Sequence, residues 1–310
     1  QTLDEHADEV ARLWARFNEV ARDNPCAWNG RPMTADEIRT PGPKNRPLAF
    51  PYNKWHNSQW NVDQAASLIL CSVEAARAHG IPEDRWVFPH ALVDAEHMVP
   101  VSRRAELHRS PGFRIAGARA FELAGVDADH IAHVDLYSCF PIAVRVQAQE
   151  LGLGTDRALT VTGGMTFAGG PLNNYVLQSI ATMVHVLRRH PGETGLVTAI
   201  SGIITKQGVS LWSTRPPANG YRSDDVTAAA AAASSRRELT SGVDAQGTVA
   251  GYTVLFDDDR PARTVAVVDV DDGTRAVAVN DDAEVARAAT TDDLGGRRVT
   301  LTQQRTFSPL

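Results

Sequence analysis

The strongest constraint on the fold is a long alternation of β-type and helical segments in the middle of the chain. Short runs of apolar and β-branched residues alternate with segments in which apolar residues recur at helical spacing. The order is β-α-β-α-β-α-β-β, over residues 86–93, 113–124, 131–137, 141–151, 159–162, 173–189, 196–201 and 209–213. Such alternation is typical of α/β proteins, so we expect a mostly parallel sheet with helices on its faces and one antiparallel edge.

The sequence before this series predicts a clear helix followed by a long loop. Leu13, Trp14 and Phe17 are among the apolar residues at helical spacing between positions 4 and 23. Residues 24–51 are rich in proline, glycine and asparagine, which predicts an ordered loop with little regular structure. Residues 65–72 form a short apolar run of the strand type. We therefore expect residues 1–85 to form a loop region with one last strand, and residues 86–217 to form the α/β unit.

The C-terminal part of the chain differs in both charge and pattern. Between residues 241 and 310, twelve acidic residues outnumber seven basic ones, so this stretch holds most of the chain's net charge of −6. Alternating β-type runs over 249–256, 264–270, 275–279 and 298–303 predict a small antiparallel β module of OB-like size. Residues 218–240, with six consecutive alanines, predict a linker or a short surface helix.

Composition excludes several classes of protein. Of 310 residues, 43% are hydrophobic, which suits a globular protein, but no apolar run of about eighteen residues predicts a membrane span. No signal-peptide pattern is present, so we expect a cytoplasmic protein. The negative net charge argues against nucleic-acid binding. Cys26, Cys71 and Cys139 form no CxxC pair, which favours reduced thiols. Because Gln rather than Met stands at position 1, we expect a piece of a longer protein.

The densest site signal lies in residues 135–141, where a predicted strand ends and a helix begins near Pro141. Ligands of open α/β sheets lie beyond the carboxyl ends of strands, where helix N-termini offer free N–H groups. Tyr137, Ser138 and Cys139 would therefore project toward a substrate. The alternative is that Cys139 and Phe140 are core residues and Ser138 only caps the helix.

Two further strand ends carry polar or glycine-rich segments. Residues 163–175 hold a glycine pair at each end of a loop, which permits close backbone approach, but they match neither a Walker nor a Rossmann pattern. Alone, such a segment could be only the cap of the next helix. Ser201 and Gly202 end the next predicted strand. Three strand ends of this kind favour a shared pocket.

The order of these segments resembles the C-terminal domain of the thiolase superfamily. Residues 136–140, 163–171 and 196–202 follow the order of the Asn-Glu-Ala-Phe, Gly-His-Pro and Cys-x-Gly-Gly motifs of that domain. Residues 57–70 resemble the segment in which a loop that contacts pantetheine leads into the last strand of the thiolase N-terminal half. The resemblance implies a layered βαβαβαββ half-fold, similar to actinobacterial thiolase-like proteins of the sterol-carrier-protein type that are described as acetyl-CoA acetyltransferases.

The catalytic residues of the family are replaced in this sequence. Gly170 stands at the His of Gly-His-Pro, Tyr137 and Ser138 stand at Asn-Glu, and Ile200 or Ser201 stands at the acid/base Cys. The family's nucleophilic Cys belongs to the N-terminal half, which has no counterpart in these residues. Claisen condensation needs a nucleophile and a base, so we expect no ordinary thiolase activity. The candidate catalytic positions are Tyr137, Ser138, Gly170 and Ser201.

What the resemblance carries over is a frame for binding a coenzyme A thioester. It places Cys139 and Phe140 beside the pantetheine arm, and the loop of Asn57, Ser58 and Gln59 beside the thioester. The remaining candidate binding residues are Gly164, Gly169 and Gly202.

No permanently bound cofactor and no metal site are expected. Residues 269–273 resemble a calcium loop, but the position of the glycine and the lack of a twelfth-position Glu favour an Asp-Gly hairpin turn. His130 and His133 have no third ligand nearby in the sequence. We therefore treat the coenzyme A thioester as a substrate or ligand.

Three functions stay open. The leading hypothesis is a thiolase-fold, acyltransferase-like protein of lipid metabolism that binds acyl-CoA thioesters, with altered or absent condensing activity. One alternative is a retro-aldolase or lyase that acts on a CoA-linked substrate and uses Tyr137 as acid or base. The other is a scaffold whose acidic β module docks a partner. Expected partners are a thiolase N-terminal half, in the same polypeptide or a companion subunit, and further copies of the chain in a homo-oligomer.

Overall fold

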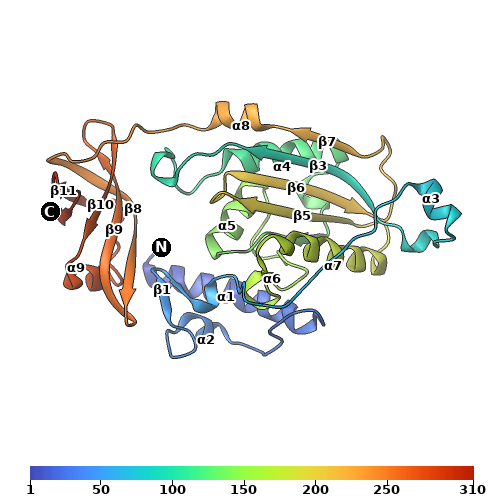
Figure 1. The fold of residues 1–310 in the computed structure, drawn as a ribbon, viewed down its shortest axis with the longest axis horizontal. Helices are drawn as coiled ribbons and strands as arrows, with labels where there is room; N and C mark the ends of the chain where they lie inside the picture. The colour runs from blue at the N-terminus through green and yellow to red at the C-terminus, as the bar shows by residue number, and fades with distance from the viewer.

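The computed structural model describes residues 1–310 and contains two separate β-sheets (Figure 1). The larger unit holds a five-stranded sheet in the order β4-β5-β6-β3-β7. Its strands are β3 Phe88–Glu96, β4 His133–Asp135, β5 Thr194–Ser201, β6 Lys206–Ser213 and β7 Arg222–Asp225. β4 with β5 and β3 with β7 are parallel pairs, whereas β5 with β6 and β6 with β3 are antiparallel.

The mixed sheet corrects the expectation of a mostly parallel one. β6 follows β5 after a short turn, and strands joined this way pair antiparallel. The strand expected over residues 159–162 is also absent, because the N–H groups of Val161 and Thr162 donate to the buried carboxylate of Asp135 instead of a neighbouring strand. Residues 218–240, expected as a linker or a short surface helix, form the alanine-rich helix α8, Thr227–Ala233, and also supply β7 to the sheet, which the sequence did not predict.

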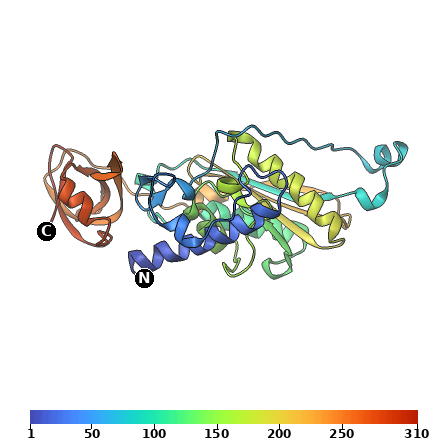
Figure 2. The same ribbon diagram turned by 90° about the horizontal axis from the view of Figure 1, so that it is seen from below.

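Helices cover both faces of the five-stranded sheet. On one face, buried side chains of α4 (Pro111–Ala124) and α5 (Pro141–Glu150) share a core cluster with Leu196. On the other, Met183 and Leu187 of α7 (Tyr175–Arg189) pack with Val197, as the two-residue period of a strand requires. Figure 2 shows α7 along one side of the sheet. No helix of the chain combines the length and apolar character needed to cross a membrane.

The N-terminal helix and the loop after it pack beside this unit. The predicted helix is confirmed as α1, Leu3–Asp23, and begins with a capping box of Thr2 and Glu5. Trp14 of α1 donates from Nε1 to Thr166 Oγ1 at 3.1 Å, which ties α1 to the short helix α6, Gly164–Phe167. The loop over residues 24–51 has more regular structure than expected, since it contains α2 (Ala35–Arg39) and β1 (Pro47–Ala49).

The second sheet has seven strands, and all of its paired strands are antiparallel, as predicted for the C-terminal module. Its C-terminal elements are β8 Ala245–Asp257, β9 Arg260–Val270, β10 Arg275–Asn280, α9 Ala283–Ala288, β11 Arg298–Leu301 and β12 Phe307–Pro309. Two strands from the N-terminal loop, β1 and β2 (Tyr52–Asn53), extend the sheet through the pairing of Ala49 with Leu255. These strands are too short for the sequence pattern to predict.

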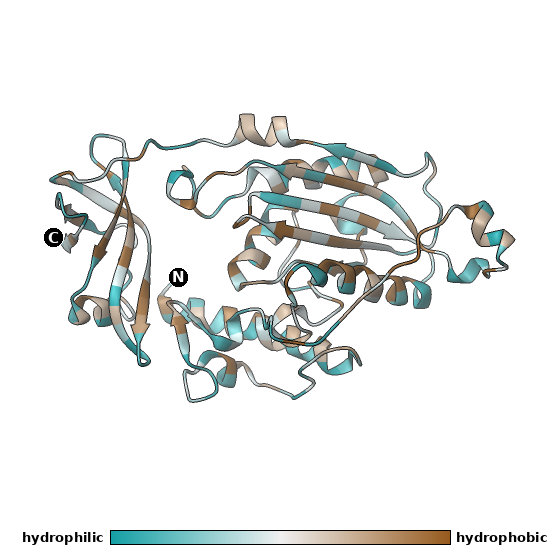
Figure 3. Cartoon of the chain, in the orientation of Figure 1, coloured by the Kyte–Doolittle hydropathy of each residue, from teal (hydrophilic) through white to brown (hydrophobic).

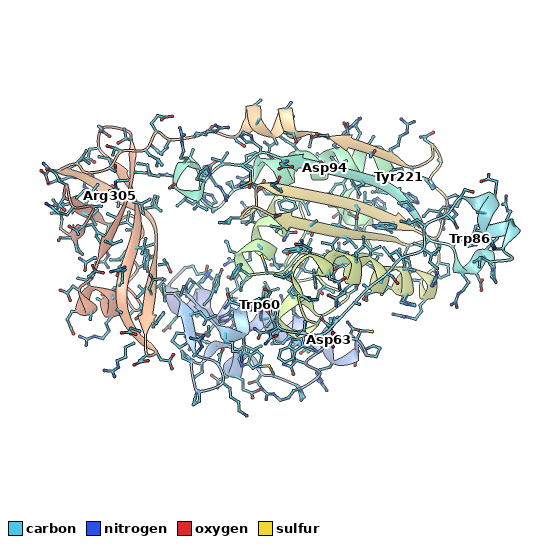
Figure 4. All side chains as sticks on the ribbon, viewed as in Figure 1. Trp60, Asp63, Trp86, Asp94, Tyr221 and Arg305 are labelled. Carbon is cyan, nitrogen blue, oxygen red and sulfur yellow. The ribbon has the colours of Figure 1, made fainter.

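Residues 57–72 form an extended segment that leads away from the body to α3, Val73–Ala78 (Figure 1). The strand expected over 65–72 is absent, because a strand needs a partner for its backbone hydrogen bonds and none lies beside this segment. Ile69 and Leu70 are 96% and 74% exposed. Hydrophobic residues run along the segment in Figure 3, and Figure 4 labels Trp60 and Asp63 on it. We call residues 60–72 the apolar arm.

Candidate functional site

A cavity of about 370 Å³ lies where β4 and β5 end. It is bounded by the start of α5, by the short helix η5 (Leu172–Asn174) and by the turn between β5 and β6. Ten of its twelve lining residues are hydrophobic, which makes it an apolar pocket at a sheet edge where ligands of α/β proteins bind. The lining residues are Tyr137, Cys139, Phe140, Ile142, Ala143, Leu172, Asn173, Val176, Ile200, Ser201, Ile203 and Ile204.

Two side chains fix Tyr137 in the cavity wall through hydrogen bonds to its backbone N–H and carbonyl groups. Its N–H donates to Thr198 Oγ1 at 2.9 Å, and its carbonyl accepts from Gln147 Nε2 at 2.8 Å. Gln147 also accepts from Thr198 Oγ1 at 2.6 Å, so β5 and α5 are joined to each other at this point. Burial, and then the neighbouring Cys139, raise the pKa of Tyr137. Its phenol is therefore a proton donor at neutral pH.

Cys139 and Phe140 lie at the beginning of α5, on the cavity side. Burial raises the pKa of the Cys139 thiol to about 11, so it is protonated at neutral pH and a weak nucleophile. The Phe140 ring stacks on Tyr52 with centroids 6.1 Å apart and remains 42% exposed. The Tyr52 hydroxyl accepts from the N–H of Ile142 at 3.1 Å, which satisfies one free donor of the first turn of α5.

A buried carboxylate holds the floor of the site together. Asp135 is completely buried, and its Oδ2 accepts from Thr160 Oγ1 and from both N–H and Oγ1 of Thr162 at 2.9 to 3.0 Å. Its Oδ1 accepts from Tyr175 at 3.0 Å and Ser179 at 2.7 Å, two residues of α7. Burial, followed by Asp135, raises the pKa of Tyr175 well above its usual value, so this hydroxyl stays a donor. Asp135 thus joins β4, the segment after α5 and α7.

The glycine-rich loop passes close to its neighbours at two of the predicted binding positions. A Cβ at Gly164 would lie 2.5 Å from Phe17 Cδ1, and one at Gly169 would lie 2.2 Å from Gln64 Oε1. Both residues have positive φ, 75° and 103°. Glycine is therefore required here by packing and backbone conformation. Neither glycine lines the cavity.

The loop of Asn57, Ser58 and Gln59 joins the strand end to the glycine-rich loop. The N–H of Ser58 donates to the carbonyl of Cys139 at 3.1 Å, and the carbonyl of Asn57 accepts from Thr166 Oγ1 at 3.0 Å. Gln59 donates to the carbonyl of Met165 and accepts from the N–H of Gly170. The three residues lie behind the cavity wall and not in it.

The structure brings some of the predicted site residues into the cavity and leaves others outside. Tyr137, Cys139, Phe140 and Ser201 line it. Ser138 is completely buried and its hydroxyl accepts from the N–H of Met165 at 2.9 Å, so it supports the glycine-rich loop and does not reach the cavity.

Gly170 and Gly202 also lie outside the lining. A Cβ at Gly170 would meet the Met165 side chain at 2.8 Å, and one at Gly202 would meet Met98 Sδ at 2.6 Å. Gly170 is linked to the cavity only through its carbonyl, which accepts from the N–H of Leu172 at 2.8 Å. Both glycines allow close packing. No contact between Gly170 and the cavity supports the prediction that Gly170 is a catalytic position.

Sequence analysis missed the apolar residues that shape the entrance. Leu172, Ile203 and Ile204 have positive φ values of 50°, 54° and 63°. This backbone conformation is disfavoured in all residues except glycine and is a strained state for β-branched isoleucine. Leu172 and Ile203 are also largely exposed. The only signal in the sequence was the apolar pair Ile203-Ile204 in a turn, where polar residues are usual.

No lining residue of this cavity carries a carboxylate, imidazole or ammonium group. Its two titratable groups, Tyr137 and Cys139, both have raised pKa values and are therefore neutral at physiological pH. The arrangement can hold an apolar ligand and donate a hydrogen bond or a proton. It offers no group that is ready to remove a proton.

Comparison with known proteins gives relatives by sequence and by structure, of which three are described in turn. No family model matches the chain. Over 140 residues the chain is 26% identical to "Acetyl-CoA acetyltransferase 1" of Arabidopsis thaliana, a match that covers 45% of this chain and 31% of that protein. The chain therefore spans about a third of the length of this curated relative.

The structural relatives cover more of the chain. The Ltp2-ChsH2(DUF35) aldolase matches 67% of this chain and 59% of its own with a TM-score of 0.54 and 21% identity, a likeness of fold alone. The monomeric SCP2-thiolase-like protein type 1 of Mycobacterium smegmatis matches all of this chain and 69% of its own, with a TM-score of 0.88 and 30% identity. A match of that identity and extent agrees with the motif order in the sequence, and the chain belongs to the thiolase superfamily.

Proposed function

We propose that this chain binds acyl-CoA thioesters, with the pantetheine and acyl groups against the apolar cavity at the ends of β4 and β5. The observation that carries the proposal is the cavity itself, which is apolar and edged by Leu172 and Ile203, two residues with strained backbone and exposed side chains. Backbone strain persists where surrounding structure enforces it, and it clusters at ligand sites.

The residues of the same cavity also support the expectation that this chain lacks ordinary thiolase activity. A condensing enzyme needs a nucleophile and a base, but Cys139 is held as a thiol and Tyr137 as a phenol. We expect no cleavage of acetoacetyl-CoA above background. Turnover that Cys139→Ala abolishes would contradict this assignment.

Calorimetric titration tests the binding proposal directly. Coenzyme A, acetyl-CoA and a longer acyl-CoA such as octanoyl-CoA should be titrated into the chain. Burial of apolar surface contributes about 25 cal/mol per Å², so affinity should rise with acyl length. Equal affinity for all three, or binding to none, would sink the proposal and favour the scaffold hypothesis for the acidic module.

A second candidate function follows from the position of Tyr137 in the cavity wall. In a retro-aldol cleavage of a 3-hydroxyacyl-CoA, the C3 hydroxyl gives up its proton as the bond between C2 and C3 breaks, C3 becomes a carbonyl, and the enolate carbon C2 takes up a proton. The net change moves one proton from the hydroxyl to C2. Tyr137 lines the cavity as a neutral phenol, so its oxygen can accept the hydroxyl proton while its own O–H proton passes to C2. The reaction is established if the chain releases product from a 3-hydroxyacyl-CoA, and if Tyr137→Phe abolishes this release without changing the affinity for the substrate. Equal rates in the two proteins would remove Tyr137 from it.

We also propose that the apolar arm pairs with a thiolase N-terminal half, supplied by the same polypeptide or a companion subunit. The arm is extended, apolar and without a strand partner, which is the state of an edge that another sheet completes. Ile69→Asp and Leu70→Asp should leave the melting temperature of this chain unchanged, because both side chains are exposed. The same changes should abolish capture of a co-expressed N-terminal half. Undiminished capture would contradict the proposal.

A further inference from the structure

Three metal-ligating side chains converge at the end of the five-stranded sheet opposite to the cavity. His133 begins β4, His190 follows α7, and Glu193 lies in the turn between α7 and β5. Their donor atoms all lie within 4.8 Å of one another, and no other three His, Cys, Asp or Glu residues of the chain form such a group. Of these three residues, the sequence indicated only His133 as a candidate ligand, in a pair with His130 that has no third ligand nearby.

The geometry of this cluster is close to that of a metal site. Glu193 Oε2 lies 2.6 Å from His133 Nε2 and 4.0 Å from His190 Nδ1. The two imidazole rings are 5.0 Å apart between centroids, with their planes inclined at 47°. Tetrahedral zinc with bonds of about 2.1 Å separates its ligand atoms by about 3.4 Å. The observed distances lie on either side of this value, so small side-chain rotations would complete the site.

The fold fixes the three ligands through the backbone and leaves an open side. His133 pairs with Gly195 in the parallel ladder of β4 and β5, and the N–H of Glu193 donates to the carbonyl of His190 at 3.3 Å in the intervening turn. His190 and Glu193 side chains are about half exposed, whereas His133 is mostly buried. A metal ion would thus have three protein ligands and a water-accessible fourth position.

The ligand set selects the kind of metal. Two imidazoles and one carboxylate suit zinc and other late divalent transition ions, whereas calcium and magnesium require several oxygen ligands.

We propose that His133, His190 and Glu193 bind one divalent transition-metal ion of the zinc type. The ion joins the edge strand β4 to the end of α7. His133 and Tyr137 are four residues apart, about 13 Å along a strand, so the metal site is separate from the acyl cavity. Its role is to anchor the edge strand, and zinc binding should raise the melting temperature of the chain.

Zinc titration of the full chain, purified without a histidine tag, tests the proposal by calorimetry and equilibrium dialysis. We expect one zinc ion per chain, no competition from a large excess of magnesium, and a Kd that increases at least about tenfold in His190→Ala and in Glu193→Gln. His130→Ala is the matched control, because His130 is exposed, contacts Asp127 and lies outside the cluster. It should bind zinc as the unmodified chain does.

Two results would overturn the proposal. One is the absence of saturable zinc uptake by the unmodified chain. The other is uptake of unchanged affinity in both His190→Ala and Glu193→Gln, which would place the ion elsewhere. Melting temperatures without zinc serve as the folding check, since both substituted side chains are half exposed and their loss should leave the apo protein folded.

Discussion

The hydroxyl of Tyr175 donates a hydrogen bond of 3.0 Å to Oδ1 of Asp135 inside the protein, where both residues are completely buried. Asp135 also accepts from residues after α5 and from Ser179 of α7, without an Arg or Lys partner. The carboxylate therefore depends on hydroxyl and backbone donors for its stability. It connects the site floor to the helix on the other face of the sheet.

Asp135→Asn should destabilise the protein by on the order of 3 kcal/mol, because an amide nitrogen would face N–H and O–H donors that now point at an oxygen. Tyr175→Phe removes a single donor and should cost about 1 to 2 kcal/mol. Urea unfolding of the two variants measures both values. A loss in Asp135→Asn no larger than that in Tyr175→Phe would show that the network acts through one bond.

Phe140→Ala should weaken acyl-CoA binding about five- to thirtyfold, because an aromatic wall buries apolar ligand surface worth about 1 to 2 kcal/mol. The ring is partly exposed and lines the cavity, so its removal should have a smaller effect on stability than the loss of a core phenylalanine. Calorimetric titration at a temperature where both proteins are folded gives the comparison. Tyr221→Ala is the control, since this exposed tyrosine lies outside the cavity (Figure 4). Equal affinities in Phe140→Ala and the parent would remove Phe140 from the site.

The main helices of the fold could be predicted from the sequence, whereas strand pairing could not. α1, α4 and α7 show helical periodicity because each buries one face, whereas α5 is buried on most of its sides and is marked by Pro141 at its start. β7 has only polar side chains, Arg222–Asp225, and becomes a strand because the edge of β3 is free to pair with it. Pairing of this kind depends on a partner distant in sequence.

The candidate site was predictable only where it follows a strand end. Tyr137, Cys139 and Phe140 could be found because they lie between β4 and α5, at an edge where ligands bind. Ile203 and Leu172 could not, because their orientation follows from positive φ values that the folded surroundings impose. His190 and Glu193 come close to His133 only through the parallel pairing of β4 with β5.

Acidification should destabilise the protein through His56. Burial lowers the pKa of His56 to about 4, and its Nδ1 accepts from the N–H of Asn53 at 3.0 Å. Above pH 6.5 the ring is neutral in both folded and unfolded chains, so it makes no pH-dependent contribution. As the pH falls from 6.5 toward 4, the unfolded chain takes up a proton that the folded chain excludes, and stability is lost.

The expected loss from His56 between pH 7.5 and 4.5 is on the order of 2 to 3 kcal/mol. His56→Asn keeps a hydrogen-bond acceptor near Asn53 but does not titrate, so the pH dependence of its unfolding free energy should be smaller by that amount. Urea unfolding at the two pH values measures the difference. Parallel pH profiles for the two proteins would mean that His56 is not the group responsible.

Ile203→Gly should stabilise the chain while weakening its ligand binding. Ile203 has a φ of 54° and an exposed side chain, so glycine relieves backbone strain and removes little packing. Strain relief less the flexibility that glycine adds predicts a gain of about 0.5 to 1 kcal/mol. The same change deletes part of the cavity wall, so acyl-CoA affinity should fall.

The matched control for Ile203→Gly is Arg305→Gly, because Arg305 also has a positive φ, 60°, but lies in the C-terminal module (Figure 4). It should gain stability with unchanged affinity. If Ile203→Gly instead loses stability, or gains it without any loss of affinity, the strained turn is not maintained for the ligand.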